Sequence, residues 1–130
     1  MIGSTRSVRV FAYARPADLR KGFDGLHGMV VRELGRDPLS GDCYLFVNKN
    51  RRRAKVLLYD GTGLCIYAKR LEQGSFACLW KSDLRSDDAS SLELTMSELA
   101  LFIEGSSLVG KQRLSPEVSV PRSLEERHAV

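Results

Sequence analysis

Five positively charged side chains fall within seven residues near the middle of this 130-residue chain. Such a run can neutralise the phosphate groups of a nucleic acid, and the planar guanidinium group of Arg fits phosphate geometry. Two asparagines in the same stretch can add hydrogen bonds to a phosphate backbone. The stretch lies between two predicted strands and therefore predicts a DNA-contacting hairpin loop. It consists of Asn48, Lys49, Asn50, Arg51, Arg52, Arg53 and Lys55.

Two smaller basic clusters, one of Arg15, Arg20 and Lys21 and one of Lys69 and Arg70, would enlarge this surface if the fold brings them to the same side. The alternative is that the hairpin charges only keep a sheet edge in solvent and prevent aggregation. The sequence leaves both interpretations open. The predicted DNA-binding residues are Lys49, Arg51, Arg52, Arg53, Lys55, Arg20, Lys21, Lys69 and Arg70.

The two halves of the chain carry opposite charge. Residues 1–70 hold 14 Lys and Arg against 6 Asp and Glu, whereas residues 71–130 hold 6 against 10. The basic half suits an acidic partner such as DNA. The acidic half, or the side chains of Tyr67 and Trp80, could instead dock on a protein. A protein adaptor that does not touch DNA is therefore the alternative function.

Catalytic and metal-binding chemistry finds little support. Two or three of the carboxylates of Asp18, Asp24, Asp37 and Asp60 could hold Mg²⁺ if they converged. Asp18 also suits a helix start, however, and Asp37 and Asp60 each open a turn. The chain has neither a P-loop nor a G-x-G-x-x-G motif. We predict no catalytic residue, no cofactor and no small-molecule substrate.

A zinc site is not expected either. Cys43, Cys65 and Cys78 form no C-x-x-C pair, and His27 and His128 lie far apart in the sequence. Each cysteine stands next to apolar residues, which predicts three small buried thiols. The sequence therefore predicts no metal ligands.

The hydrophobic pattern predicts an α+β fold. Alternation of apolar residues predicts strands, and Leu19, Phe23, Leu26, Val30 and Leu34 follow helical spacing up to Gly35. We expect a mostly antiparallel meander of four to five strands, with one long helix packed on a face and a short C-terminal helix. The expected helix is Pro16–Leu34. The expected strands are Val8–Ala14, Cys43–Val47, Ala54–Tyr59, Leu64–Leu71 and Ser75–Trp80, and Leu92–Leu94 is a further candidate for a short strand.

Three glycines, Gly22, Gly25 and Gly28, fall within the expected long helix, where each costs about 0.8–1 kcal/mol relative to Ala. We interpret them as sites where the helix backbone approaches the sheet closely; a ligand contact or a kinked helix is the alternative. Thr95 and Glu98 match a capping box for the C-terminal helix.

Residues 1–105 are predicted to form one domain, and residues 106–130, rich in Ser, Pro and charge, a mobile tail. No apolar stretch approaches the roughly 18 residues that a membrane span needs. The first nine residues lack the apolar segment of a signal peptide. We therefore expect a cytoplasmic protein without a membrane partner.

The sequence also resembles a known family. Residues 18–26 read DLRKGFDGL, which is similar to the D-[ML]-R-K-[GS]-[FI]-[DN]-G-L signature of the TnpB accessory proteins of insertion sequence 66 family elements. The similarity continues in order through DPLSG (37–41), LFV (45–47), KVLLYDG (55–61) and KRLEQGSF (69–76). It covers about residues 8–105, with Tyr59 at a position where the family often has Trp.

This resemblance implies a non-catalytic accessory role in bacterial DNA transposition and recombination. The catalytic acidic residues would belong to a separate transposase, which is the implied protein partner together with other proteins of the same element. The family is unrelated to the RNA-guided nucleases that share the TnpB name. The resemblance supplies no catalytic residue to carry over to this chain.

Overall fold

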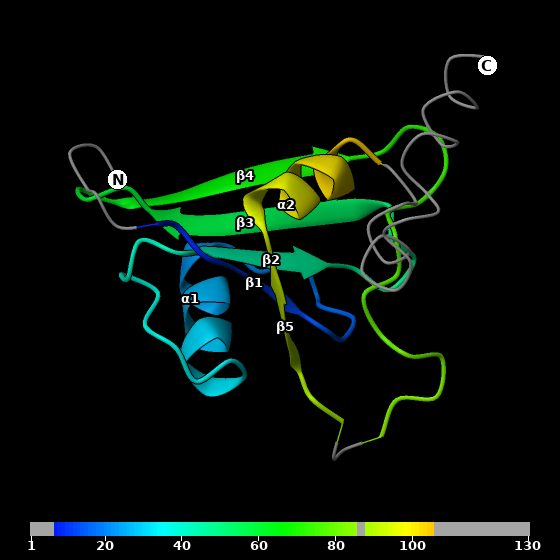
Figure 1. The fold of residues 1–130 in the computed structure, drawn as a ribbon, viewed down its shortest axis with the longest axis horizontal. Helices are drawn as coiled ribbons and strands as arrows, with labels where there is room; N and C mark the ends of the chain where they lie inside the picture. The colour runs from blue at the N-terminus through cyan, green and yellow to red at the C-terminus, as the bar shows by residue number, and fades with distance from the viewer. Residues whose placement is uncertain (1–6, 86–87, 106–130) are drawn as a thin grey trace.

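A five-stranded sheet with one helix on each face forms the fold in the computed structural model, which describes residues 7–85 and 88–105 (Figure 1). The strand order in the sheet is β4-β3-β2-β1-β5. Strand β1 is buried along its whole length because it lies between two neighbours and under both helices. The elements are β1 (Val10–Tyr13), α1 (Phe23–Arg32), β2 (Cys43–Val47), β3 (Arg53–Tyr59), β4 (Leu64–Arg70), β5 (Ser91–Leu94) and α2 (Met96–Ile103).

The sheet is mixed, because β1 and β2 run parallel while the other three pairs are antiparallel. The sequence predicted a mostly antiparallel meander, and that prediction is confirmed for β2, β3 and β4. It missed the parallel pair. A parallel return needs a long crossover, and the segment containing α1 provides it between β1 and β2.

Helix α1 is much shorter than the predicted Pro16–Leu34 helix, so that prediction is wrong. The chain before it is a loop in which the Ala17 N–H donates to the Val47 carbonyl at 2.9 Å. Asp18 closes a turn by accepting from the Arg20 N–H at 3.0 Å, and so does not begin a helix. Gly22 then precedes the first helical residue, Phe23. The predicted stop is confirmed, since Gly35 follows the helix at φ 63°.

The interpretation of the helix glycines is also wrong. Gly22 lies before α1, and nothing stands within 4 Å of the place where its Cβ would be. A Cβ at Gly25 would meet the side chain of Lys21, and one at Gly28 would meet the guanidinium group of Arg32. Gly25 and Gly28 therefore make room for neighbouring basic side chains, and none of the three glycines lies against the sheet.

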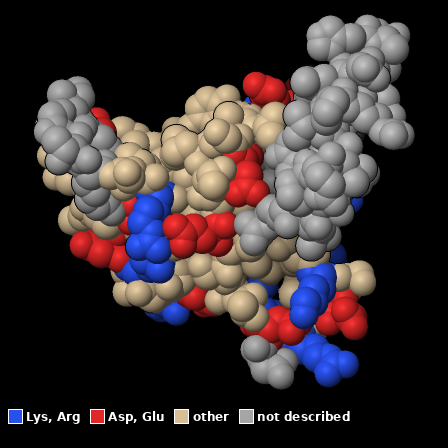
Figure 2. Space-filling view, viewed as in Figure 1, with Lys and Arg blue, Asp and Glu red and all other residues tan. Residues whose placement is uncertain are grey.

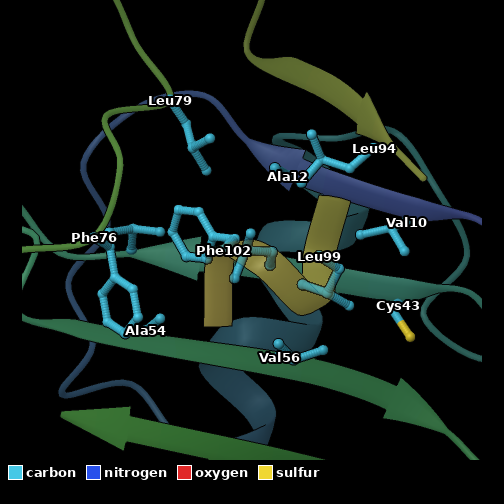
Figure 3. Packing of buried hydrophobic residues seen from close by; sticks show 12 residues of the cluster. Val10, Ala12, Cys43, Ala54, Val56, Phe76, Leu79, Leu94, Leu99 and Phe102 are labelled. Atoms are coloured by element: carbon cyan, nitrogen blue, oxygen red, sulfur yellow. The ribbon is translucent and has the colours of Figure 1, made fainter. Parts of the chain in front are cut away.

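The predicted strand Ser75–Trp80 is absent, and the chain there forms an irregular loop. Phe76 and Leu79 are nevertheless buried in the α2-side core (Figure 3). Their burial comes from packing under the second helix, where the rings of Phe76 and Phe102 stack with centroids 5.0 Å apart. The apolar pattern of this segment thus indicated burial but not strand pairing.

Strand alternation divides the apolar side chains between two cores. Val10, Ala12 and Leu45 point to the α2 side, where Leu99 and Phe102 cover them. The intervening residues of β1 and β2 point to the α1 side and meet the buried residues of that helix. They include Phe11, Tyr13, Tyr44 and Phe46, packed with Leu26, Met29 and Val30.

The C-terminal elements agree with the sequence analysis. Strand β5 contains the predicted Leu92–Leu94 strand. The Thr95 hydroxyl accepts from the Glu98 N–H at 3.0 Å, and the Glu98 carboxylate accepts from the Thr95 N–H at 2.9 Å, so the capping box is confirmed. The predicted tail, residues 106–130, lies outside the described residues.

Candidate nucleic-acid interface

The basic turn between β2 and β3 is built by its two asparagines. The side-chain oxygen of Asn48 accepts from the N–H groups of Arg52 and Arg53 at 3.1 and 3.0 Å, and that of Asn50 accepts from Arg52 at 3.1 Å. Arg51 adopts φ 60°, a left-handed conformation that is uncommon outside glycine. These asparagine oxygens therefore hold the turn together, which fixes the directions of the three arginines that follow.

Four of the predicted DNA-binding residues donate to backbone carbonyls of the protein. Lys55 does so from the α1 side and is described below; we call the other three the anchored cations. Arg51 Nη1 donates to Phe76 O at 2.8 Å. Arg52 Nη2 donates to the carbonyls of Leu71 and Glu72 at 3.2 and 3.1 Å. The third residue is Lys69, whose ammonium group donates to Ile103 O at the C-terminal end of α2 at 2.8 Å.

The next two basic residues of the run point to the opposite side of the sheet. Arg53 and Lys55 alternate with Ala54 and Val56, which belong to the α2-side core, so they share the α1 side with Leu57. On this side Arg53 lies directly opposite Arg70 of β4. Like charges placed opposite one another destabilise a sheet. The positive charge of Arg70 is partly neutralised by an ion pair with Glu72, in which the nitrogen and oxygen atoms are 3.2 Å apart.

The loop before α1 brings further basic residues to the same place. Lys55 Nζ donates to the Lys21 carbonyl at 3.0 Å, which fastens the loop to β3. Arg20 is highly exposed and forms a salt bridge with Asp18 at 2.9 Å. Hydrogen bonds from Arg20 hold the pKa of Asp18 well below its usual range. Buried Leu19 anchors the loop between these exposed charges.

Two open hollows follow this arrangement across the surface. One is lined by residues 17–20 together with Asn48, Lys49, Asn50 and Arg53. The other is lined by Leu19, residues 53–55 and residues 68–70. They share Leu19 and Arg53 and therefore adjoin one another. The charged residues of the two linings are Asp18, Arg20, Lys49, Arg53, Lys55, Lys69 and Arg70. We leave out the anchored Lys69 and add Lys21, whose carbonyl holds the Lys55 ammonium group, and call this set the basic face: Arg20, Lys21, Lys49, Arg53, Lys55 and Arg70.

Six of the nine predicted residues thus come together from three separate segments of the chain. Within the described part of the chain, the side chains of Lys49 and Arg53 form no hydrogen bond or ion pair. Figure 2 shows the α2 side, where Lys and Arg lie side by side with Asp and Glu around a broad uncharged area. Arg53, Lys55 and Arg70 of the basic face point to the other side of the sheet. Two cations of the basic face also have acidic partners, since Arg20 is paired with Asp18 and Arg70 with Glu72.

The acidic residues considered for metal binding each have a local role or stand apart. Asp60 accepts from the Thr62 and Gly63 N–H groups at 2.9 and 3.0 Å, and hydrogen bonds led by that of Thr62 lower its pKa to about 2. Asp24 lies in the first turn of α1. In residues 7–85 and 88–105, no three His, Cys, Asp or Glu side chains gather as a metal site.

The prediction of three buried thiols is correct only for Cys43. Burial raises the pKa of that thiol. Cys65 is half-buried and Cys78 is exposed, because β4 is an edge strand and the segment after it is a loop. Of the two aromatic residues proposed for protein docking, Tyr67 is 50% exposed, whereas Trp80 is half-buried against the α2-side core.

Sequence reasoning missed one exposed residue beside the basic face. Phe23 was assigned to the buried stripe of the predicted helix, yet it is 50% exposed. It occupies the first position of α1, and Lys21 lies two residues before it. A helix starting at Gly22 would have placed Phe23 at the open end of the apolar stripe, but the sequence pattern gave no sign of that start.

Neither helix in the described part of the chain has the length and apolar character needed to cross a membrane. No solved structure matches the chain. Two relatives are proteins of Sinorhizobium fredii that carry the names uncharacterized protein y4jC and uncharacterized protein y4hO. The first is 31% identical over 105 residues, which cover 81% of this chain and 85% of the relative. The second is 30% identical over 105 residues, which cover 81% and 86%.

The family model described as IS66 Orf2 like protein matches residues 8–113, which include every strand and helix described above. That range also contains the signature at residues 18–26 and all six residues of the basic face. The chain therefore belongs to the IS66 Orf2-like protein family, whose role lies in the transposition of insertion sequences.

Proposed function

We propose that the protein is a non-catalytic accessory factor in bacterial DNA transposition, and that it contacts DNA through the basic face. The observation that carries this proposal is the convergence of three chain segments on two adjoining hollows whose linings contain several cationic side chains and, among acidic residues, Asp18 alone in the described chain. Arg53 lies opposite Arg70, and this pairing of like charges does not stabilise the sheet. A bound phosphate group would neutralise the repulsion between the two guanidinium groups.

The chemistry of the basic face suits phosphate groups. Arg53 and Lys49 have no internal partner in the described chain. Lys55 uses one N–H of its ammonium group on Lys21 and retains two. Such contacts bind DNA of any sequence and release counterions, which makes the affinity depend steeply on salt. The proposal therefore includes DNA as a partner without base-specific contacts.

The proposed setting is the cytoplasm, beside a separate transposase that carries out the chemistry. Relatives of the chain come from a bacterium, and the family acts in transposition. No cofactor and no small-molecule substrate enter the proposal. The anchored cations are assigned to folding, and we expect them to add little to the affinity for DNA.

Salt-dependent binding of a fluorescent duplex tests the proposal. The purified full chain is titrated with a duplex that carries the terminal sequence of the element and with an unrelated duplex. For the Lys49→Gln/Arg53→Gln variant we expect weaker binding to both duplexes and a log Kd against log salt slope reduced by about 1.8. Equal binding by wild type and this variant would contradict the proposed surface.

A matched control removes the same charge at a distance from the basic face. Lys81 and Arg85 lie in the segment before β5, at the opposite edge of the sheet from β4. Lys81→Gln/Arg85→Gln should leave the slope unchanged. If the wild type binds neither duplex at low salt, the adaptor function becomes the better account, with exposed Tyr67 on the α2 side as the first surface to mutate.

A further inference from the structure

Phe23 and Tyr67 are the two aromatic residues in the described part of the chain that reach 50% exposure, and only Phe23 adjoins the basic face. Tyr67 points to the α2 side, where the nearest cation on its strand, Lys69, is bound to Ile103 O. Phe23 stands at the start of α1, directly after Arg20, Lys21 and Gly22. A single exposed aromatic residue is ordinary on a protein surface. The surroundings of Phe23 are what distinguish it.

The position of Phe23 on α1 turns it toward the sheet. It precedes Leu26 by three residues and Val30 by seven, and both of these are fully buried against the sheet. Phe23 continues this stripe past its buried part. The hydrogen bond from Lys55 to the Lys21 carbonyl places the start of the helix over β3. The exposed Phe23 therefore follows, two residues later, the point where the chain is bound to Lys55 of β3.

The side chain of Lys21 runs along the first turn of the same helix, since a Cβ on Gly25 would lie 2.7 Å from the Lys21 Cβ. Gly22, between Lys21 and Phe23, is exposed, and nothing stands near its Cβ position. The ring is thus open to a large flat ligand on a surface that otherwise attracts phosphates.

We propose that Phe23 is a stacking platform for an unpaired base and that the basic face binds single-stranded DNA in preference to duplex. Proteins that bind single strands combine cations that follow the phosphates with aromatic rings on which bases stack. In a duplex the faces of the bases are covered by their neighbours, so Phe23 could not reach one without opening the helix. This inference rests on the proposed function, because it concerns the same surface.

The experiment compares a mixed-sequence single strand with the duplex of that sequence, using the full chain. Wild type should bind the single strand more tightly. Phe23→Ala and Phe23→Leu should each lose about 5- to 150-fold in affinity for the single strand. Their affinity for the duplex and their salt slopes should stay as in wild type. Phe23→Leu keeps an apolar side chain, so it separates stacking from simple burial.

Val31→Ala is the matched control, because Val31 is an apolar residue of the same helix with similar exposure, 48%. It should bind both DNAs as wild type does. Circular dichroism checks that each variant is folded. Equal affinity of wild type for single strand and duplex, or an unchanged affinity in Phe23→Leu, would overturn the stacking role.

The outcomes also separate this inference from the function on which it rests. Suppose that duplex binding is weaker in the Lys49→Gln/Arg53→Gln variant and that the Phe23 variants bind single strand and duplex as wild type does. This result would support the DNA contact by the basic face and contradict the stacking role of Phe23. Absence of binding to both DNA forms would remove both proposals together.

Discussion

Arg51 and Arg53 are two residues apart in the same basic run, yet the structure gives them opposite environments. The left-handed turn at Arg51 directs its guanidinium to the carbonyl of Phe76, inside the protein. Arg53 begins β3 and points to the α1 side, where it faces Arg70 and no acidic partner is described. A run of like charges is therefore not one functional unit. Local backbone conformation divides it into residues that stabilise the fold and residues that are available to a ligand.

This division has a measurable consequence. Removing an anchored cation should lower the stability of the protein and leave its affinity for DNA nearly intact. Removing a cation of the basic face that has no partner in the described chain, such as Arg53, should lower the affinity for DNA and leave the stability intact or higher. The variants described next test that contrast, beginning with the largest expected effect.

Arg51→Ala should lower the free energy of unfolding by about 1.5–3 kcal/mol, the range for hydrogen bonds made by charged groups. The substitution leaves the Phe76 carbonyl without its guanidinium donor, and Phe76 is fully buried in the core under α2. Urea denaturation followed by circular dichroism measures the change. The salt dependence of DNA binding should stay as in wild type.

Arg51→Gly is the matched control, because it removes the same hydrogen bond but relieves the left-handed backbone. We expect it to be more stable than Arg51→Ala by roughly 1 kcal/mol. A loss of DNA affinity in both variants, with stability unchanged, would assign Arg51 to the ligand and break the contrast.

Arg53→Thr should have the opposite pair of effects. Replacing one of two arginines that face each other across β3 and β4 removes a repulsion, and we expect the free energy of unfolding to rise by about 0.2–1 kcal/mol. The affinity for DNA should fall in the same variant. Stability is measured by urea denaturation, and binding by the fluorescent duplex assay.

Arg70→Thr sharpens this test, because it relieves the same repulsion but also breaks the ion pair with Glu72. Its gain in stability should be smaller than that of Arg53→Thr. A lower free energy of unfolding for Arg53→Thr would show that Arg53 stabilises the fold, which would contradict its assignment to DNA binding.

Sequence reasoning identified the α+β class, the meander and the capped C-terminal helix, because these depend on local patterns such as the Thr95–Glu98 box. It extended α1 backward to Pro16, since the spacing of Leu19 and Phe23 fits a helix although Asp18 closes a turn. It also read the burial of Phe76 as a strand. The conformation around Phe76 is set by contacts with distant residues, whereas that of residues 17–20 depends on the local Asp18 turn as well as on the distant bond from Ala17 to Val47.

The same limit applies to the candidate site. The basic run and the two smaller clusters could be found from the order of residues in the sequence. Arg20, Arg53 and Arg70 do come together around the two hollows. The separation of Arg51 and Lys69 from them could not be predicted, because it depends on the carbonyls of Phe76 and Ile103. The exposure of Phe23 depended on where α1 begins.

The two ends of the β3–β4 hairpin provide the smallest and most specific test of the contrast. At the open end Arg53 and Arg70 repel, whereas at the turn Asp60 accepts hydrogen bonds that lower its pKa to about 2. An aspartate in an unfolded chain has a pKa of about 3.9.

Because the folded value is the lower one, the stabilisation by Asp60 is fully present above about pH 4 and is lost as the pH falls toward about 2. Urea midpoints of wild type and Asp60→Asn should therefore differ at neutral pH and converge over that range, by a small amount because Asp60 is exposed. The other carboxylates titrate in both proteins and cancel in the difference. A difference that stays constant from pH 7 to pH 2 would show that the charge of Asp60 does not stabilise the turn.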